Sequence, residues 1–416
     1  MLGVLLARVL RTIRRAEYAE LTALFFITGA ALGMWFVPLS NVLDAHGFQN
    51  LKPYAFACSA LAAFVSPLIF GAMADHHSSP VKVLRGLSLA TAVSMALATT
   101  AIKRHGNPWL ILGLVQLQAL CSSPAWSLSS TIVFARLADA KKEFGPIRAM
   151  ATLGWMAGCW LISAVGADTS AVAGYSAAGA WLGVCAFTFF LPGLEPPRAI
   201  VTLKWHQHLG LDALTLLKNR DHRVVFMTTT LFCIPMAGFY LYAPPHLREI
   251  GLTHTSAWMS LGQITEIIAM FSLSALLANW RLKWIVAVGL AFGVLRFALS
   301  AVGGPAWLIA GVLLHGCSYT LVLITAQIYL DQRVEPAWRA RGQALLMLVN
   351  GGVGSLIGYL GVGAWFRVCA RADGNHWSLF WGGLSATVAM VLIIFLTAYR
   401  GRGAHMGASS SNSVRN

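Results

Sequence analysis

Long apolar segments, separated by short polar connections, run through the whole chain. A helix that crosses the hydrocarbon core of a bilayer needs about 20 predominantly apolar residues. Twelve segments approach this length, so the pattern predicts an all-α membrane protein with twelve transmembrane helices. The predicted spans are residues 20–43, 55–73, 86–102, 109–134, 147–165, 171–191, 224–247, 256–277, 284–302, 307–330, 342–366 and 377–399.

The longest polar connection, residues 192–223, divides these spans into two groups of six. Two six-helix halves joined by a basic loop are the architecture of the major facilitator superfamily, in which the substrate site lies between the halves. In the loop between the second and third spans, residues 71–75 (Gly-Ala-Met-Ala-Asp), followed by Lys82 and Arg85, resemble the signature that the superfamily carries there. The expected parts are a basic N-terminal segment at 1–19, an N-terminal six-helix half at 20–191, a cytoplasmic central loop at 192–223, a C-terminal six-helix half at 224–399 and a disordered tail at 400–416.

The composition supports lipid as the solvent of this chain. Charged residues make up 11% and hydrophobic residues 57%, whereas a soluble domain carries about 25% charged residues. The net charge is +15, but no basic face separates from the apolar segments, so no nucleic-acid partner is expected. Most of the 30 Lys and Arg residues fall in alternate connections, which favours a multi-pass protein of a bacterial-type inner membrane with both termini cytoplasmic. The seven cysteines are scattered without a CxxC pair, so neither a metal site nor a redox site is expected.

Glu266 is the one acidic residue in the middle of a predicted span. Gln263 lies three residues earlier, so both side chains project from the same helix face. An ionisable side chain in a membrane span is costly unless it is paired or hydrated, and it marks a functional site by default. We therefore expect Glu266 to bind a proton or the substrate. The structural alternative is a static ion pair with Arg296 in the next span.

Arg148, Thr152 and Trp155 fall at positions i, i+4 and i+7 of the fifth span and form one stripe of a helix. The stripe offers a fixed cation, a hydroxyl group and a large ring, which suits a polyhydroxylated ligand that carries an aromatic ring. The alternative is an Arg at the cytoplasmic interface beside a Trp that packs in the core. His315 and Tyr319 form a similar stripe in the tenth span, where the alternative is hydrogen bonding that only holds helices together.

Several segments, in order along both halves, resemble the nucleoside:proton symporter family of the major facilitator superfamily. The segments are Pro146-Ile147-Arg148 with Thr152-Leu153-Gly154-Trp155, Leu209-Gly210-Leu211-Asp212-Ala213 with Leu217-Lys218-Asn219, Gln263-Ile264-Thr265-Glu266, Leu295-Arg296-Phe297-Ala298-Leu299, and His315-Gly316 with Tyr319 and Gln327-Ile328-Tyr329. The resemblance implies a pocket between the halves that binds a nucleoside and couples its import to a proton. It implies that the substrate-binding residues are Arg148, Thr152, Trp155, Gln263, Glu266, His315 and Tyr319, with Glu266 also in proton coupling.

The chain departs from the family pattern at two places. The family usually places an Asp directly after the aromatic residue at Tyr319, and here that position is Thr320. If that Asp takes part in coupling, Glu266 is the only acid in the middle of a span left to do so. In the seventh span the family has amide side chains, whereas residues 236–240 read Met-Ala-Gly-Phe-Tyr. A pocket that loses amides and keeps aromatic rings should prefer a different ligand.

The sequence therefore predicts a secondary active transporter that imports nucleosides with protons by alternating access. Catalysis is disfavoured, because no catalytic motif lies on a segment that would face a cavity. The expected partners are a nucleoside-like small molecule, protons and the lipid bilayer; no cofactor is expected, and the protein is expected to be a monomer. One alternative is a transporter or facilitator of another polyhydroxylated or aromatic solute without proton coupling. Another, from a different class, is a membrane sensor that binds a ligand without moving it.

Overall fold

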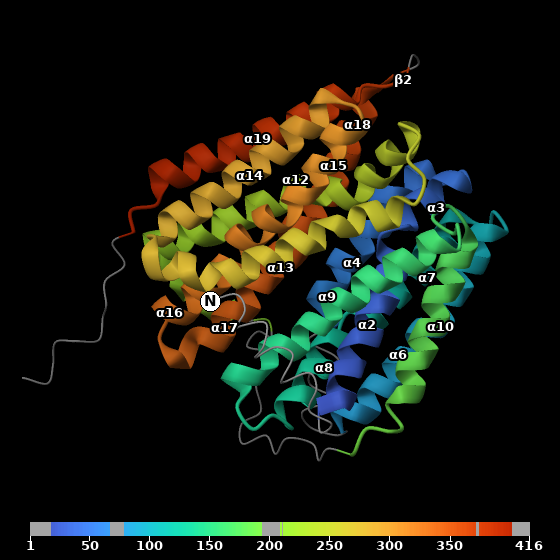
Figure 1. The fold of residues 1–416 in the computed structure, drawn as a ribbon, viewed down its shortest axis with the longest axis horizontal. Coiled ribbons are helices and arrows are strands. Elements are labelled where there is room, and N and C mark those ends of the chain that lie inside the picture. Colours follow the sequence, from blue (N-terminus) through green and yellow to red (C-terminus); the bar gives the residue numbers. More distant parts are fainter. Residues whose placement is uncertain (1–17, 67–78, 194–208, 210, 372–373, 402–416) are drawn as a thin grey trace, which may run out of the picture.

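The computed structural model of the protein describes residues 18–66, 79–193, 209, 211–371 and 374–401 (Figure 1). The predicted basic segment up to residue 17, the motif at 71–75, residues 194–208 and 210 of the central loop and the tail beyond residue 401 lie outside the described residues. The elements are α2 (Ala19–Phe36), α3 (Leu39–Ala45), η2 (Gln49–Leu51), α4 (Lys52–Ser66), α6 (Pro80–Lys103), α7 (Pro108–Ser122), α8 (Ala125–Phe134), α9 (Ala140–Ala164), α10 (Ala171–Phe187), η4 (Leu211–Lys218), α12 (Arg220–Glu249), α13 (Thr255–Asn279), α14 (Leu282–Val302), α15 (Pro305–Tyr319), η5 (Thr320–Ile324), α16 (Thr325–Arg333), α17 (Pro336–Met347), η6 (Leu348–Gly354), α18 (Ser355–Cys369), β1 (Ala370–Arg371), β2 (Gly374–Asn375) and α19 (Trp377–Ala398).

The described chain is helical apart from one short β-hairpin, β1–β2, between α18 and α19. Within the described ranges, eight helical segments are long and apolar enough to cross a membrane, and Ala171–Phe187 is a shorter apolar helix. The prediction of an all-α protein with many apolar spans is therefore confirmed in outline. Each of the twelve predicted spans overlaps a described helix, but the number twelve stays a prediction.

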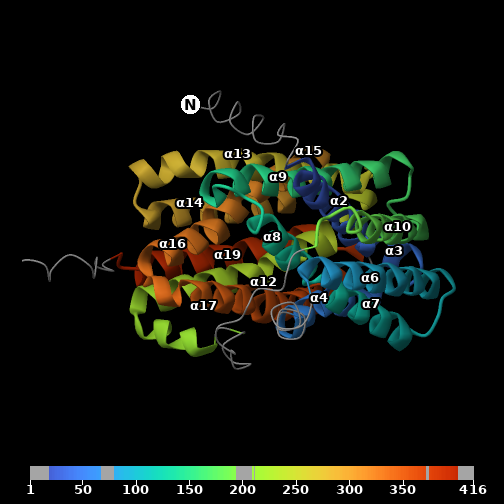
Figure 2. The ribbon, with the colours of Figure 1, turned by 90° about the horizontal axis from the view of Figure 1, so that it is seen from below.

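The helices form two groups that lie side by side (Figures 1 and 2). Helices α2 to α10 pack mainly on one another, and α12 to α19 do the same, while α9 of the first group lies against α13 of the second and α4 lies against α18. These pairings place the fifth predicted span opposite the eighth, so that the stripes read from the sequence meet at the boundary between the groups.

Close backbone contact fixes the position of α9 on α2. A Cβ atom at Gly154 would meet the backbone of Phe26, and one at Gly33 would meet the backbone of Trp155. Small residues allow helices to approach in this way, and van der Waals contact drives helix association in a membrane. The close packing of α9 on α2 therefore fixes the position of Trp155 along α2.

A second close contact positions the helices of the other group. Gly316 of α15 lies directly against the backbone of Glu266 on α13, where a Cβ atom would collide with the Glu266 amide nitrogen. Four residues beyond Gly316, at Thr320, α15 passes into the π-helical turn η5. Single π-helical turns inside α-helices are frequent at functional sites. Glu266 and His315 are thus held on neighbouring helices.

Candidate functional site

An aromatic cluster spans the boundary between the two groups of helices. Phe36 of α2 and Trp155 of α9 come from the first group, and Tyr240 of α12 comes from the second. The centroid of the Tyr240 ring lies 5.1 Å from that of Phe36 and 6.3 Å from that of Trp155, and the Phe36 and Trp155 centroids are 6.0 Å apart. The structure thus brings Trp155 to a ring that the sequence analysis did not assign to the site.

The same cluster continues into the second group. The Tyr240 ring meets His315 edge-on, with centroids 5.8 Å apart, and His315 stacks with Tyr319 at 6.0 Å. The Gln263 amide nitrogen donates to the Tyr240 hydroxyl at 3.4 Å. Four of the seven predicted residues, Trp155, Gln263, His315 and Tyr319, are therefore gathered around Tyr240. The signal for Tyr240 was present in the seventh span, where it was interpreted only as the loss of amides.

Arg148 and Glu266 lie on opposite sides of the same boundary, on α9 and α13. They are close enough for the Arg148 charge to act on the Glu266 carboxyl. The Arg148 guanidinium also covers the ring of Trp126 on α8, 4.9 Å from its centroid, whereas the alternative interpretation had placed Arg148 beside Trp155. Thr152 is half-buried one turn after Arg148. Within the described residues Glu266 has no hydrogen-bond or ion-pair partner, so its carboxyl is available to a ligand or a proton.

Arg296 does not pair with Glu266. Its Nη1 donates to His315 Nδ1 at 2.6 Å, and the guanidinium lies 4.2 Å from the centroid of the Phe239 ring. The two helices are neighbours, but Arg296 is turned toward α12 and α15 rather than toward the Glu266 carboxyl. The alternative of a static Arg296–Glu266 ion pair is therefore wrong in this structure.

Two buried polar atoms near the cluster have no hydrogen-bond partner among the described residues: Nε1 of Trp155 and Oγ1 of Thr320. An unsatisfied polar group away from water costs free energy, and both atoms are enclosed by the protein in this conformation. Thr320 lies where the family resemblance expects an Asp, and it is fully buried. The boundary thus offers a free carboxyl and several aromatic faces, which together can bind a polar molecule that contains a flat ring.

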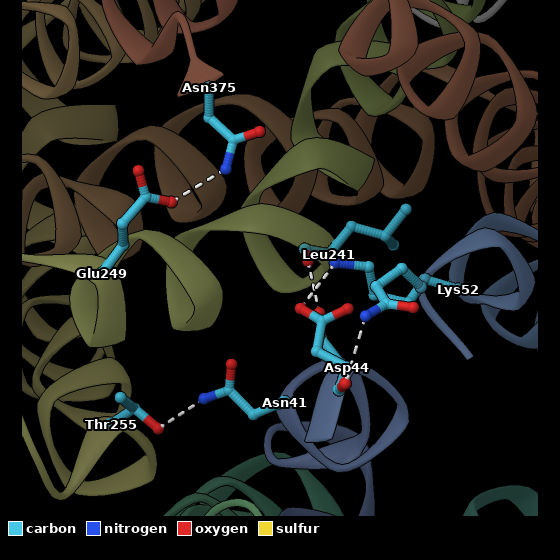
Figure 3. A network of polar contacts seen from close by, with 9 residues as sticks. Asn41, Asp44, Lys52, Leu241, Glu249, Thr255 and Asn375 are labelled. Carbon is cyan, nitrogen blue, oxygen red and sulfur yellow. Dashed lines mark hydrogen bonds and ion pairs between the residues drawn. The ribbon is translucent and has the colours of Figure 1, made fainter. Parts of the chain in front are cut away.

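The two groups of helices are joined by hydrogen bonds at one end of the molecule. We call this the far end, which holds the end of α3 and the start of α13; the near end holds the start of α12 and the end of α19. At the far end, the Asn41 amide nitrogen donates to Thr255 Oγ1 at 2.9 Å (Figure 3). Ser40 Oγ donates to the Leu241 carbonyl oxygen at 2.5 Å. The described conformation is therefore closed at the far end.

Asp168, in the connection after α9, extends this closure. Its Oδ1 accepts from the backbone nitrogen of Ser256 at 2.7 Å and from Thr255 Oγ1 at 3.2 Å. Ser163 Oγ also donates to Asp168 at 3.2 Å and accepts from the Ala257 amide at 3.0 Å. A carboxylate at the first N–H groups of a helix is a stabilising cap, and here the cap and the helix belong to different groups.

A cavity of about 510 Å³ also lies at the far end, and none of the seven predicted residues lines it. Its lining includes Asp44, Lys52, Arg248 and Arg367. The Lys52 ammonium donates to Asp44 at 2.8 Å and lies 5.1 Å from the centroid of the Tyr242 ring. Burial lowers the pKa of Lys52, and the Asp44 carboxylate opposes that shift. We place the candidate substrate site at the boundary cluster rather than in this cavity, because only the cluster combines a carboxyl without a partner and aromatic rings from both groups.

No group of three His, Cys, Asp or Glu side chains within the described ranges is arranged to hold a metal ion. The seven cysteines are free thiols, six of them buried.

The fold and the boundary site define a membrane transporter with the architecture of the major facilitator superfamily. A model of the family described as "Nucleoside H+ symporter" matches residues 17–403, and the chain belongs to this family. It is 32% identical to YegT of Escherichia coli (strain K12), a nucleoside transporter by name, over 92% of this chain and 93% of that protein. It is 23% identical to the nucleoside permease NupG of Escherichia coli (strain K12), over 90% and 94% of the two chains.

A solved structure supports the fold independently. The crystal structure of the nucleoside transporter NupG matches with a TM-score of 0.83 at 22% sequence identity, covering 93% of this chain and 100% of that one. The family and these relatives are membrane transporters rather than enzymes, so the predicted family, class and non-enzymatic function are confirmed. The roles of the seven predicted site residues are proposals.

Proposed function

We propose that the protein imports nucleosides together with protons by alternating access between two six-helix halves, residues 20–191 and 224–399. The observation that carries the proposal is the boundary cluster, in which Trp155 from one half faces Tyr240, His315 and Tyr319 from the other. A nucleoside combines a flat base with a hydroxylated sugar, and rings with adjacent polar groups suit both parts. Family membership supplies the substrate class.

The remaining features of the proposal follow from the same arrangement. Twelve spans place both termini on the cytoplasmic side of a bacterial-type inner membrane, and the protein works there as a monomer in the lipid bilayer. The far end then faces outward. Because the hydrogen bonds at Asn41 and Asp168 close that end, the described conformation has its site closed to the outside. Import requires these bonds to break once in each cycle.

Glu266 is the proposed proton carrier. Its carboxyl lies at the boundary without a partner among the described residues, and Arg148 is the cation that acts on it. Arg148, Thr152, Trp155, Gln263, His315 and Tyr319 bind the nucleoside in this proposal, and Tyr240 joins them through its contacts with Gln263 and His315. Binding of substrate and proton at one boundary links the two to the same conformational change.

Uptake of labelled uridine and adenosine into membrane vesicles, with and without an inward proton gradient, tests this function. Accumulation that depends on the gradient and disappears with an uncoupler is the expected result. Glu266→Gln should abolish accumulation while leaving exchange of nucleoside across the membrane partly intact, because Gln resembles the protonated acid. The matched control is Glu335→Gln, since Glu335 is exposed and its side chain caps no helix. Equal loss of accumulation and exchange contradicts a dedicated coupling role.

One specific observation favours a second candidate, a facilitator that moves the same solute without protons. Thr320 stands where the family has an Asp, and its buried hydroxyl has no hydrogen-bond partner among the described residues. Saturable uptake that ignores the proton gradient is the result expected of a facilitator. Absence of uptake for both nucleosides would overturn the substrate class and leave the fold unchanged.

A further inference from the structure

Arg296 and His315 form a buried polar pair on the neighbouring helices α14 and α15. Arg296 is 1% exposed and His315 is 3% exposed. The Arg296 Nη1 atom lies 2.6 Å from His315 Nδ1. A guanidinium carries five N–H donors, has no acceptor and stays protonated in proteins. Nδ1 of His315 must therefore be the acceptor of this bond and carry no proton.

This bond determines which ring nitrogen of His315 holds the proton. A neutral imidazole has one donor nitrogen and one acceptor nitrogen. Since Nδ1 is the acceptor, Nε2 carries the hydrogen. Nε2 makes no hydrogen bond within the described residues, so its N–H is free to meet a ligand.

The ring of His315 is held against reorientation as well. It stacks on Phe239 at a centroid distance of 4.3 Å and an interplanar angle of 17°, and it stacks with Tyr319 on α15 at 6.0 Å. A flip of the ring, which would exchange the two nitrogens, has little room.

Arg296 makes no ion pair with a carboxylate among the described residues. Its other contacts are the faces of Phe239 at 4.2 Å and Phe297 at 4.7 Å, and the Met236 sulfur at 3.3 Å. A charged side chain within a membrane span is expensive, and cation–π contacts with two rings offset part of that cost. A packing role alone would be met more cheaply by an apolar residue. The hydrogen bond to His315 explains why a charged side chain stands at this position.

We propose that Arg296 is a positioning residue that fixes His315 with its proton on Nε2, so that His315 offers the transported nucleoside a hydrogen-bond donor and never an acceptor. This inference rests on the proposed function. It makes His315 selective for ligands that present a lone pair at this position, such as a base carbonyl oxygen or an unprotonated ring nitrogen. A site with a fixed donor discriminates against an analogue that lacks the matching acceptor, because the donor then stays unpaired.

Two substitutions of Arg296 separate a fixed donor from mere packing. Arg296→Lys keeps a group that can only donate, so Nδ1 of His315 remains the acceptor. Arg296→Gln introduces an amide that can donate or accept, so both tautomers of His315 become accessible. His315→Gln supplies an N–H near the former Nε2 position that does not depend on Arg296. The double variant with both Gln substitutions should therefore behave like His315→Gln alone.

The first readout is the tautomer itself, measured by nitrogen NMR on purified protein with ¹⁵N-labelled histidine. His315→Gln identifies the His315 signal by its absence. The wild type and Arg296→Lys should show one protonated nitrogen at Nε2, whereas Arg296→Gln should show a mixture. A wild-type ring protonated at Nδ1, or an unchanged signal in Arg296→Gln, overturns the proposal. This measurement does not depend on any substrate.

The second readout is competition of labelled uridine or adenosine uptake by analogues that each lack one acceptor, such as deaza forms of the base. For the wild type and Arg296→Lys, one such analogue should compete about tenfold less well than its parent, as expected for one lost hydrogen bond. Arg296→Gln should lose most of this difference. Equal loss in the Lys and Gln variants would show that Arg296 acts through its shape and would overturn the proposal. A wild type with the Nε2 proton but without nucleoside uptake would support the Arg296–His315 pair and overturn only the proposed function.

Discussion

The substitution Asp168→Ala tests whether hydrogen bonds at the far end control the balance between closed and open conformations. Oδ1 of Asp168 accepts from the Ser256 amide at 2.7 Å, from Thr255 Oγ1 at 3.2 Å and from Ser163 Oγ at 3.2 Å. Asp168 and Ser163 belong to the first group of helices, whereas Thr255 and Ser256 begin α13 in the second. The bonds to α13 therefore exist only while the far end is closed.

The size of the effect follows from these contacts. A hydrogen bond to a charged group contributes about 1.5–3 kcal/mol, and loss of a helix-capping side chain costs about 1 kcal/mol. Hydration of the Asp168 carboxylate in the open conformation offsets part of this, so we expect a loss of about 2–4 kcal/mol from the closed conformation. At about 1.4 kcal/mol per tenfold change, the ratio of closed to open molecules should fall by about 30- to 1,000-fold.

Pulsed EPR between two spin labels at the far end measures this ratio. Arg104→Cys, just after α6, and Ala306→Cys, at the start of α15, are exposed positions in different groups. Asp168→Ala should shift the distance distribution toward longer distances. The control is Asp331→Ala, because Asp331 is exposed on α16 near the opposite end. An unchanged distribution in Asp168→Ala, or one that matches the control, would refute the reasoning.

Two further predictions concern stability. Gly154→Ala should lower the stability of the purified protein by about 1–3 kcal/mol through overpacking, because the new Cβ would collide with the Phe26 backbone. Gly179→Ala is the control, since nothing lies within 4 Å of its Cβ position; thermal unfolding in detergent compares them, and equal melting temperatures would contradict the packing argument. Burial lowers the pKa of Lys52 from its ordinary 10.5. In the alkaline range the unfolded chain therefore binds more protons than the folded protein, and stability increases with pH. Lys52→Met should remove this increase. Thermal unfolding across that range checks this prediction, and an unchanged pH slope in the variant would count against it.

The apolar pattern predicted the helices well because each one needs a run of suitable length to cross a bilayer. It did not predict where the runs are interrupted. The first predicted span is divided between α2 and α3 near Pro38, and the tenth contains the π-helical turn η5. A break or a π-helical turn changes the backbone hydrogen bonds of a span but does not change how apolar its residues are. Hydropathy therefore locates the spans and misses the breaks within them.

The candidate site was predictable along each helix and much less so between helices. Arg148 and Trp155 share one stripe because the period of the α-helix fixes their directions. The partner of Arg296 depends on how far α14 is rotated, and no periodic signal in one sequence reports that rotation. The sequence therefore left Glu266 as a possible partner, whereas the structure selects His315. Tyr240 stood in the segment that was interpreted only as a loss of amides, and its position at the centre of the site became evident only from contacts with α2, α13 and α15.

Arg148 and Arg296 have different partners, so the proposed coupling involves one arginine and one acid. Arg296 is occupied by His315 and two aromatic faces, so Arg148 is the cation that acts on Glu266. Thr320 stands in place of the family's Asp, so Glu266 is the acid in the middle of a predicted span that can take up and release the proton. A Gln at position 266 imitates the protonated acid permanently. It should therefore still permit the exchange of nucleoside that the protonated carrier performs, while it prevents the proton release that accumulation requires.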